Sequence, residues 1–174
     1  MRRIGLLVFA AALVAGPALA QSSETEQFEG GGTAMLAAQR EVTQRNIDMA
    51  TKALQAKDYK TARKYAQSVT RADPKRIESW LLLGAAQQGL EDWKGARTTY
   101  TRAVRMVPSH PEARAGLGIA YARTADPKAT VQLAWIDSKL KECAGCWQAS
   151  QLTKFKSDIE VAIRETPPPA AKGS

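Results

Sequence analysis

The stretch Asp58-Tyr59-Lys60-Thr61-Ala62-Arg63 returns later in the chain as Asp92-Trp93-Lys94-Gly95-Ala96-Arg97. The same shift places Arg71 on Arg105 and Pro74 on Pro108. One further step places Leu83-Gly84 on Leu117-Gly118. An offset that holds in separate stretches indicates an internal repeat. Its interval, called here one period, is about 34 residues, a length that is typical of solenoid proteins.

The residues that return have the sizes that stacked helices require. Glycine inside a helix costs about 1 kcal/mol relative to alanine, so Gly84 and Gly118 one period apart indicate close approach of a neighbouring helix. Small Ala62 and Ala96 predict the same closeness on the second helix of each pair. Large residues one turn away then fill the gaps between layers, and prolines at one register stop each second helix. We expect these positions to form the repeat core: Ala62, Trp80, Leu83, Gly84, Ala96, Tyr100, Ala103, Pro108, Leu117, Gly118 and Tyr121.

Residues 77–110 resemble a tetratricopeptide repeat, because Trp80, Leu83, Gly84, Ala96, Tyr100, Ala103 and Pro108 stand at the spacing of that family. Gln87 departs from it, at a place where an aromatic residue is usual. Residues 43–76 keep the small and turn residues, and residues 111–142 begin well but place Ala129 one residue short of register. The resemblance implies an all-α fold, a right-handed superhelical stack of about three helix hairpins with a C-terminal capping helix.

The same pattern predicts the helices. Paired helices are expected over about 34–56 and 59–72, 75–90 and 93–107, and 111–124 and 127–141. Asp58, Asp92 and Asp126 each precede a second helix, where a carboxylate can accept from free backbone N–H groups. A capping helix over about 146–164 carries an apolar stripe of Trp147, Leu152, Phe155, Ile159 and Ile163, and the repeat domain as a whole covers 34–164.

The two ends of the chain read differently from the repeats. Arg2 and Arg3 precede an apolar run that Gly16-Pro17 ends, and Ala18-Leu19-Ala20 supplies small residues at a cleavage site. This pattern predicts a secretory signal peptide over residues 1–20, with a buried N-terminal helix as the alternative. Residues 21–33 read as a flexible leader and residues 165–174 as a disordered tail. The mature chain is therefore expected in the bacterial periplasm or secreted, with no membrane span.

The charge of the chain suggests which surfaces attract it. The full chain has 25 Lys and Arg against 17 Asp and Glu; the signal peptide accounts for two of the arginines. The basic residues Arg63, Lys64, Arg71, Arg97, Arg102 and Arg105 recur on the second helices of the first two repeats. A solvated face and a binding face for an acidic partner or an anionic envelope polymer are both compatible with them. Nucleic acid is not expected, because the chain is read as exported.

Groups for catalysis are not apparent. A serine or cysteine nucleophile needs a base oriented by a third group, whereas the single histidine, His110, falls in a turn between two repeats. No phosphate-binding loop, metalloprotease or calcium-loop pattern occurs. The sequence therefore predicts no enzyme, no catalytic residue, no metal and no cofactor.

Cys143 and Cys146 are the only two cysteines and stand three residues apart. An oxidising compartment favours a structural disulfide between them. A redox-active pair is the alternative, although such pairs normally occur in a βαβ setting and these surroundings are helical. Haem attachment would need a histidine where Trp147 stands, and a zinc site would need further ligands.

The family resemblance also implies a binding surface, because the first helix of each pair lines a concave groove in that family. At this register the partner-binding residues, called here the groove residues, are Gln44, Thr51, Leu54, Gln55, Leu81, Gln88, Ile119 and Arg123. The surface lacks the Lys/Asn set with which some members clamp a C-terminal carboxylate. A partner protein or peptide, extended or helical, is therefore expected.

These observations give three functional hypotheses. The first is a protein–protein interaction scaffold, or adaptor, that binds its partner in the groove. The alternatives are a thiol–disulfide factor using Cys143 and Cys146, and a binder of anionic envelope polymer through the basic helix faces. Self-association into a homo-oligomer is compatible with all three.

Overall fold

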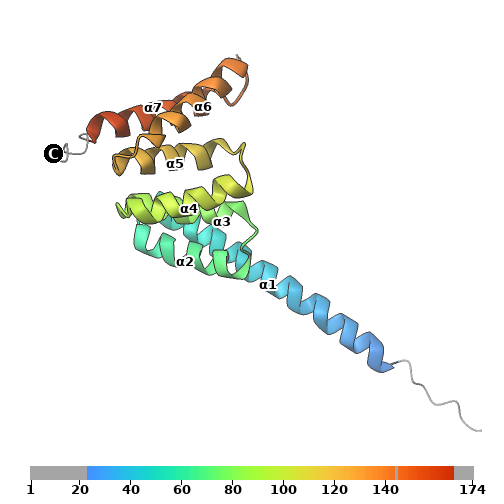
Figure 1. The fold of residues 1–174 in the computed structure, drawn as a ribbon. Helices are drawn as coiled ribbons and strands as arrows, with labels where there is room; N and C mark the ends of the chain where they lie inside the picture. Colours follow the sequence, from blue (N-terminus) through green and yellow to red (C-terminus); the bar gives the residue numbers. More distant parts are fainter. Residues whose placement is uncertain (1–22, 144, 167–174) are drawn as a thin grey trace, which may run out of the picture. The chain divides into compact units, whose positions relative to one another are not determined.

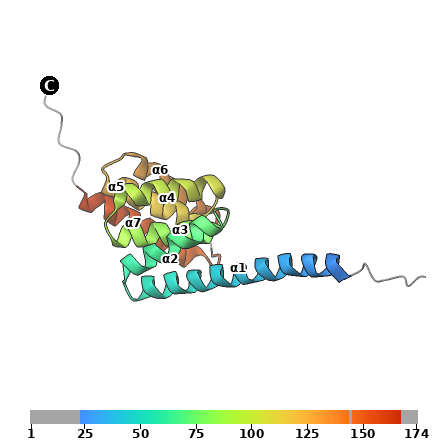
Figure 2. The ribbon, with the colours of Figure 1, turned by 90° about the horizontal axis from the view of Figure 1, so that it is seen from below.

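The structure is a computed structural model that describes residues 23–143 and 145–166, and these residues form seven α-helices and no strand. Figures 1 and 2 show the helices, which are α1 (Ser23–Gln55), α2 (Tyr59–Ala72), α3 (Ile77–Gly89), α4 (Trp93–Met106), α5 (Pro111–Arg123), α6 (Lys128–Glu142) and α7 (Ala149–Glu165). The predicted all-α fold is thus confirmed. The chain divides into two units, residues 1–38 and residues 39–174. The packing described below lies within the second unit.

The described part of the first unit, residues 23–38, is the N-terminal part of α1. The structure differs here from the expected flexible leader, because the helix already begins at Ser23. The three glycines at 30–32 are the weakest point of this helix, at about 1 kcal/mol each relative to alanine. Residues 1–20, the predicted signal peptide, and residues 167–174 of the predicted tail 165–174 lie outside the described residues, while Glu165 is the last residue of α7.

Alanines join the first hairpin to the second. Ala50 of α1 and Ala66 of α2 pack with Leu83 of α3 in one buried cluster. A second cluster holds Ala53 of α1, Ala62 of α2 and Ala86 of α3. Small side chains at these places let three helix backbones approach closely, as the repeat predicted.

A buried tyrosine joins the second hairpin to the third. Tyr100 of α4 is 2% exposed and packs with Leu81, Ala113 and Leu117. Its ring lies against two glycines, since a Cβ added at Gly84 would come within 2.6 Å of Tyr100 Cζ and one at Gly116 would come closer still. The helical glycine at 84 therefore makes room for an aromatic ring.

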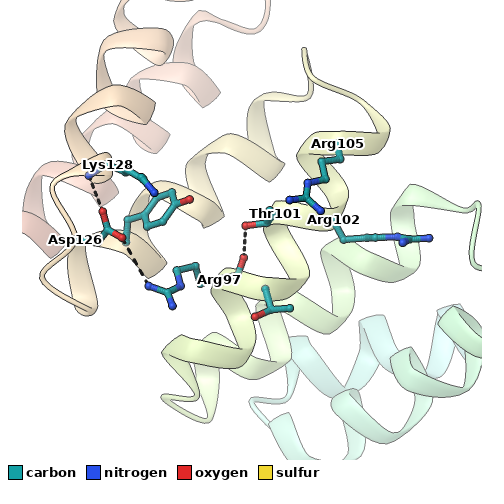
Figure 3. A pocket seen from close by; sticks show the side chains of 8 residues that line it. Arg97, Thr101, Arg102, Arg105, Asp126 and Lys128 are labelled. Atoms are coloured by element: carbon teal, nitrogen blue, oxygen red, sulfur yellow. Dashed lines mark hydrogen bonds and ion pairs between the residues drawn. The ribbon is translucent and has the colours of Figure 1, made fainter.

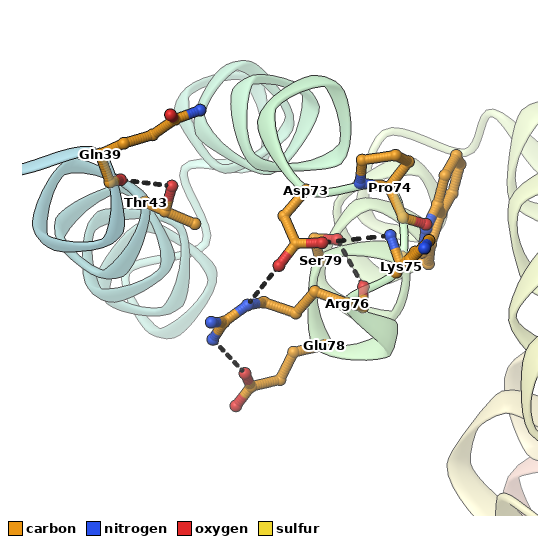
Figure 4. A network of polar contacts seen from close by, with 9 residues as sticks. Gln39, Thr43, Asp73, Pro74, Lys75, Arg76, Glu78 and Ser79 are labelled. Atoms are coloured by element: carbon orange, nitrogen blue, oxygen red, sulfur yellow. Dashed lines mark hydrogen bonds and ion pairs between the residues drawn. The ribbon is translucent and has the colours of Figure 1, made fainter. Parts of the chain in front are cut away.

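The turns between hairpins repeat one hydrogen bond. Trp80 Nε1 donates to the carbonyl of Pro74 at 3.0 Å, and one period later Arg114 Nε donates to the carbonyl of Pro108 at 2.7 Å. Around the first of these turns, Figure 4 shows Asp73 accepting from the backbone N–H of Lys75 and from the Arg76 side chain. These bonds satisfy the polar groups of a turn that has left the helix.

The turns within hairpins repeat a backbone conformation. Lys57, Glu91 and Ala125 all have positive φ, at 58°, 58° and 52°, and each lies one period from the next. Asp58 and Asp92 follow and accept from the backbone N–H of Thr61 at 3.1 Å and of Gly95 at 3.0 Å. Hydrogen bonding to Thr61 lowers the pKa of the Asp58 carboxyl. The predicted capping role of Asp58 and Asp92 is therefore confirmed.

Helix α7 packs on both α5 and α6 and closes the stack at its C-terminal end. Leu152 and Ile159 are buried, and Phe155 and Ile163 are partly buried against them or their neighbours. The placement of Trp147 on this stripe is wrong, because the side chain is 84% exposed and precedes the helix. The backbone N–H of Cys146 donates to the Cys143 carbonyl, and the helix starts only at Ala149.

Candidate functional site

The groove residues of α1 are accessible. Gln44 and Gln55 are exposed, and Thr51 and Leu54 are half-buried. The Thr51 hydroxyl donates to the Ile47 carbonyl at 2.9 Å, while Gln44 Nε2 donates to Asp48 at 3.1 Å. This part of the row offers two amides and an edge of apolar surface.

The groove residues of α3 are engaged inside the protein. Leu81 is only 7% exposed and belongs to the core cluster around Tyr100, so its assignment to an open surface is wrong. The small neighbours Ala96, Ala103 and Ala113 let α4 and α5 close over it. Gln88 is half-buried and bridges α4 and α5, since it donates to the Gly116 carbonyl at 3.1 Å and accepts from the Tyr100 hydroxyl at 3.1 Å.

The groove residues of α5 are covered by the last helix. Ile119 packs against clusters that contain Leu152, Ile159 and Ala162 of α7. Arg123 forms an ion pair with Glu165 of α7 at 2.5 Å, and its guanidinium lies 5.6 Å from the centre of the Trp93 ring. The packing of the half-buried Ile119 and the ion pair of Arg123 hold α5 to the capping helix. The accessible part of the predicted row is therefore on α1.

His110 and the two cysteines lie in connections between neighbouring helices. His110 lies directly before α5, and its Nδ1 accepts from the backbone N–H of Ala113 at 3.4 Å. Cys143 and Cys146 lie between α6 and α7 with their Cα atoms 5.2 Å apart, a separation that a disulfide can bridge. Over residues 23–143 and 145–166, no group of three or more His, Cys, Asp or Glu side chains is placed to hold a metal ion.

A second candidate surface is a hollow of about 440 Å³ between α4 and the start of α6, called here the basic cleft. Figure 3 shows its labelled residues, which are Arg97, Thr101, Arg102, Arg105, Asp126 and Lys128. Arg97 lies 3.7 Å from the Asp126 carboxylate, which also accepts from the backbone N–H of Lys128 at 3.0 Å. The cleft thus has four cations and one carboxylate.

Two of these cations lie over aromatic rings. The guanidinium of Arg102 is 5.3 Å from the centre of the Trp80 ring, and Nζ of Lys128 is 5.9 Å from that of the Tyr121 ring. Such contacts hold a cation in place and leave its outward N–H groups available. The sequence had singled out Arg97, Arg102 and Arg105 but not Lys128, which lies on another hairpin. A positive residue two places after Asp126 is the only sequence signal for it, and that signal is weak.

These features define a class of protein: a repeat protein in which helix hairpins stack through small residues at a fixed period. Residues 53–115 match the family model described as tetratricopeptide repeat. Among solved structures, the TPR2B domain of yeast Sti1, in its complex with pHsp70, is similar. That match has a TM-score of 0.57 at 14% identity and covers 70% of this chain and 98% of that domain. A search of curated proteins gave no match.

Residues 53–115 are therefore similar to tetratricopeptide repeats, and a helical-hairpin fold of this kind serves in general as a protein–protein interaction scaffold. The matched span starts near the end of α1 and ends within α5, so it includes the whole second hairpin. Over the part of the chain that the structure describes, no helix is both long and apolar enough to cross a bilayer.

Proposed function

We propose that the chain is a periplasmic adaptor that binds a segment of a partner protein along α1, on the groove side of the first hairpin. The observation that supports this site is the contrast along the row of groove residues. Gln44 and Gln55 of α1 are exposed, whereas Ile119 and Arg123 of α5 are half-buried in contact with α7. A partner segment would find open amide groups and the half-buried Leu54 only at the N-terminal end of the row.

The chemistry of this surface favours an extended segment with mixed side chains. The side-chain amides of Gln44 and Gln55 can each donate to and accept from a peptide backbone. Leu54, partly buried against a cluster of alanines, offers an apolar contact beside them. Tetratricopeptide repeats in general hold protein partners, and the similar yeast domain is in complex with pHsp70; the partner of this chain is expected to differ, since the Lys/Asn clamp is lacking.

Site-specific photo-cross-linking in intact cells tests this site. A benzophenone side chain at Gln55 should yield an adduct with one partner protein, and the same group at Lys60, an exposed position on α2, should not. The double variant T51R/Q55R, which fills the surface with charge, should remove the adduct formed from Gln44. Equal adducts at Gln55 and Lys60, or no protein adduct from either, would refute the proposed site.

The periplasmic location rests on the pattern of the first twenty residues and has a separate test. Mass spectrometry of the protein recovered from the periplasmic fraction should find Gln21 as its first residue. An uncleaved chain that remains in the cytoplasm would contradict the location without affecting the cross-linking result.

A further inference from the structure

The basic cleft carries positive charge that the described protein does not neutralise. Of its four cations, Arg97 has the Asp126 carboxylate at 3.7 Å. Within residues 23–143 and 145–166, Arg102, Arg105 and Lys128 form no ion pair with a carboxylate. Three cations around one hollow repel one another, and this repulsion is relieved when an anion binds.

Two of the three cations without a carboxylate partner lie against aromatic rings before any ligand arrives. The Trp80 ring fixes Arg102 and the Tyr121 ring fixes Lys128. The hydroxyl of Thr101 donates to the Arg97 carbonyl at 2.7 Å, so its proton is occupied in α4. The donors that remain available to a ligand are therefore the guanidinium and ammonium N–H groups. Donors of this kind match carboxylate oxygens in charge and geometry.

We propose that the basic cleft is a second binding site, which takes an acidic segment of a protein, with two or more carboxylate side chains, against Arg102, Arg105 and Lys128. The Asp126 carboxylate beside Arg97 already has the kind of contact that a ligand carboxylate makes there. A volume of about 440 Å³ accommodates a short run of side chains and exceeds what one small inorganic ion fills. The Tyr121 ring supplies an apolar wall that suits the methylene groups of glutamate.

An anionic polymer is the competing ligand, and the shape of the charge distribution argues against it. A long polyanion needs a continuous track of cations, but Asp126 places a negative charge at the α6 end of the cleft. A polymer that tracks positive charge along the second helices would also contact basic residues of α2, which include Arg63 and Arg71. The two ligands therefore differ in whether α2 contributes to binding.

The register of the repeat provides matched variants for this difference. Arg71 of α2 stands one period before Arg105 of α4, and both are exposed. R105E and K128E should each weaken binding of a fluorescein-labelled hexaglutamate peptide by about tenfold, which corresponds to ~1.4 kcal/mol. R71E, with the same change of charge at the equivalent position, should change it less than about twofold, because Arg71 does not line the cleft and salt screens charges outside it. Anisotropy titrations of the mature chain at two salt concentrations measure all three, with circular dichroism to confirm folding.

Three results would overturn the proposal. The first is the absence of hexaglutamate binding at low salt, and the second is an equal loss in R71E and R105E, which indicates attraction to net charge alone. The third is binding of dextran sulfate in preference to hexaglutamate with equal dependence on Arg71 and Arg105, which indicates a polymer track. None of these results affects cross-linking at Gln55, so the two proposed sites are tested independently.

Discussion

The second and third hairpins make the same contact with exchanged residues. In α3–α4 the guanidinium of Arg102 lies 5.3 Å from the centre of the Trp80 ring. In α5–α6 the guanidinium of Arg114 lies 4.6 Å from that of the Trp135 ring. Arg114 stands one period after Trp80. Trp135 stands one residue less than a full period after Arg102. Ala129 stands at the same shortened interval after Ala96.

The exchange shows that the repeat specifies a pair of side chains at this place. Either member can come from the first helix, because a cation over an aromatic ring is attracted whichever helix supplies the ring. Whichever residue stands on the first helix also donates to the proline carbonyl of the preceding turn. The first hairpin has a polar version of the pair, in which Asn46 Nδ2 donates to Ser68 Oγ at 3.3 Å.

The largest expected effect comes from breaking this pair in the second hairpin. W80R removes an indole that packs on two core clusters and places two guanidinium groups together. A loss of about 3 kcal/mol of unfolding free energy is expected, near the low end for large aromatic residues. The double variant W80R/R102W recreates the third hairpin's arrangement and should recover at least ~1 kcal/mol relative to the sum of the single variants.

Urea unfolding followed by circular dichroism gives the free energies for this double-mutant cycle. The matched cycle with R114W and W135R should give a coupling of the same sign in the third hairpin. Additive effects in both cycles would mean that the two residues contribute independently and that the exchange has no energetic basis.

The hairpins also differ in what fills the space that glycine leaves. A Cβ at Gly84 would lie 2.6 Å from the rigid Tyr100 ring, whereas one at Gly118 would lie 2.9 Å from Cδ1 of Ile159, the end of a flexible side chain. Overpacking costs about 1–3 kcal/mol, and alanine in a helix recovers about 1 kcal/mol relative to glycine. G84A should therefore lose up to about 2 kcal/mol, while G118A should be near neutral in the same urea experiment. A larger loss in G118A than in G84A would contradict this account of the two glycines.

The sequence predicted the hairpin stack because the period survives in small and large residues alike. Gly84, Ala96 and Tyr100 are placed in the structure as their sizes required. The exchange of the aromatic and the cationic residue between the two helices could not be predicted, because Trp135 falls one residue out of register with Arg102. Arg114 by itself indicates only that the tryptophan of the repeat is absent from this position. A pair of compensating residues is not detected when each position is compared only with the equivalent position of another repeat.

The candidate site was predicted less completely than the fold. Family spacing identifies which residues of α1, α3 and α5 lie on one row, but the burial of each depends on what packs over it. Ile119 and Arg123 are covered because α7 is present, and nothing in the repeat states where a helix after the last hairpin will lie. Leu81 is buried because its neighbours on α4 and α5 are alanines. The basic cleft needed the structure, since Lys128 and Arg102 belong to different hairpins.

Tyr100 should give the second hairpin a pH dependence. Burial raises the pKa of the Tyr100 hydroxyl above its usual range, and the charge of Glu112 adds to this. The folded state therefore keeps the proton, while the unfolded state loses it above pH ~10. Stability from this group is complete below that pH and falls by up to about 1.4 kcal/mol per unit above it.

Y100F tests this, because phenylalanine has no proton to lose. The variant should cost about 1 kcal/mol at neutral pH through loss of the hydrogen bond to Gln88, and its stability should fall less steeply than that of the wild type above pH ~10. Y65F serves as a control at a half-buried ring on α2. Parallel slopes for wild type and Y100F would show that Tyr100 is not protected in the folded state.

The smallest effect is expected where the hairpins are alike. Lys57, Glu91 and Ala125 adopt positive φ at the same point of three successive turns, although none is glycine. A residue with a Cβ is strained in this left-handed region by about 1–2 kcal/mol, and glycine is not, although it loses more entropy on folding. E91G and A125G should each stabilise the protein by about 0.5 kcal/mol, the balance of these two terms. L90G, next to the turn with φ of −91°, should destabilise it, because there glycine relieves no strain, brings the entropy cost and removes a half-buried leucine side chain. If E91G and L90G lowered the urea midpoint alike, the repeated backbone conformation would carry no strain, and the turns would owe their shape to the aspartates that follow.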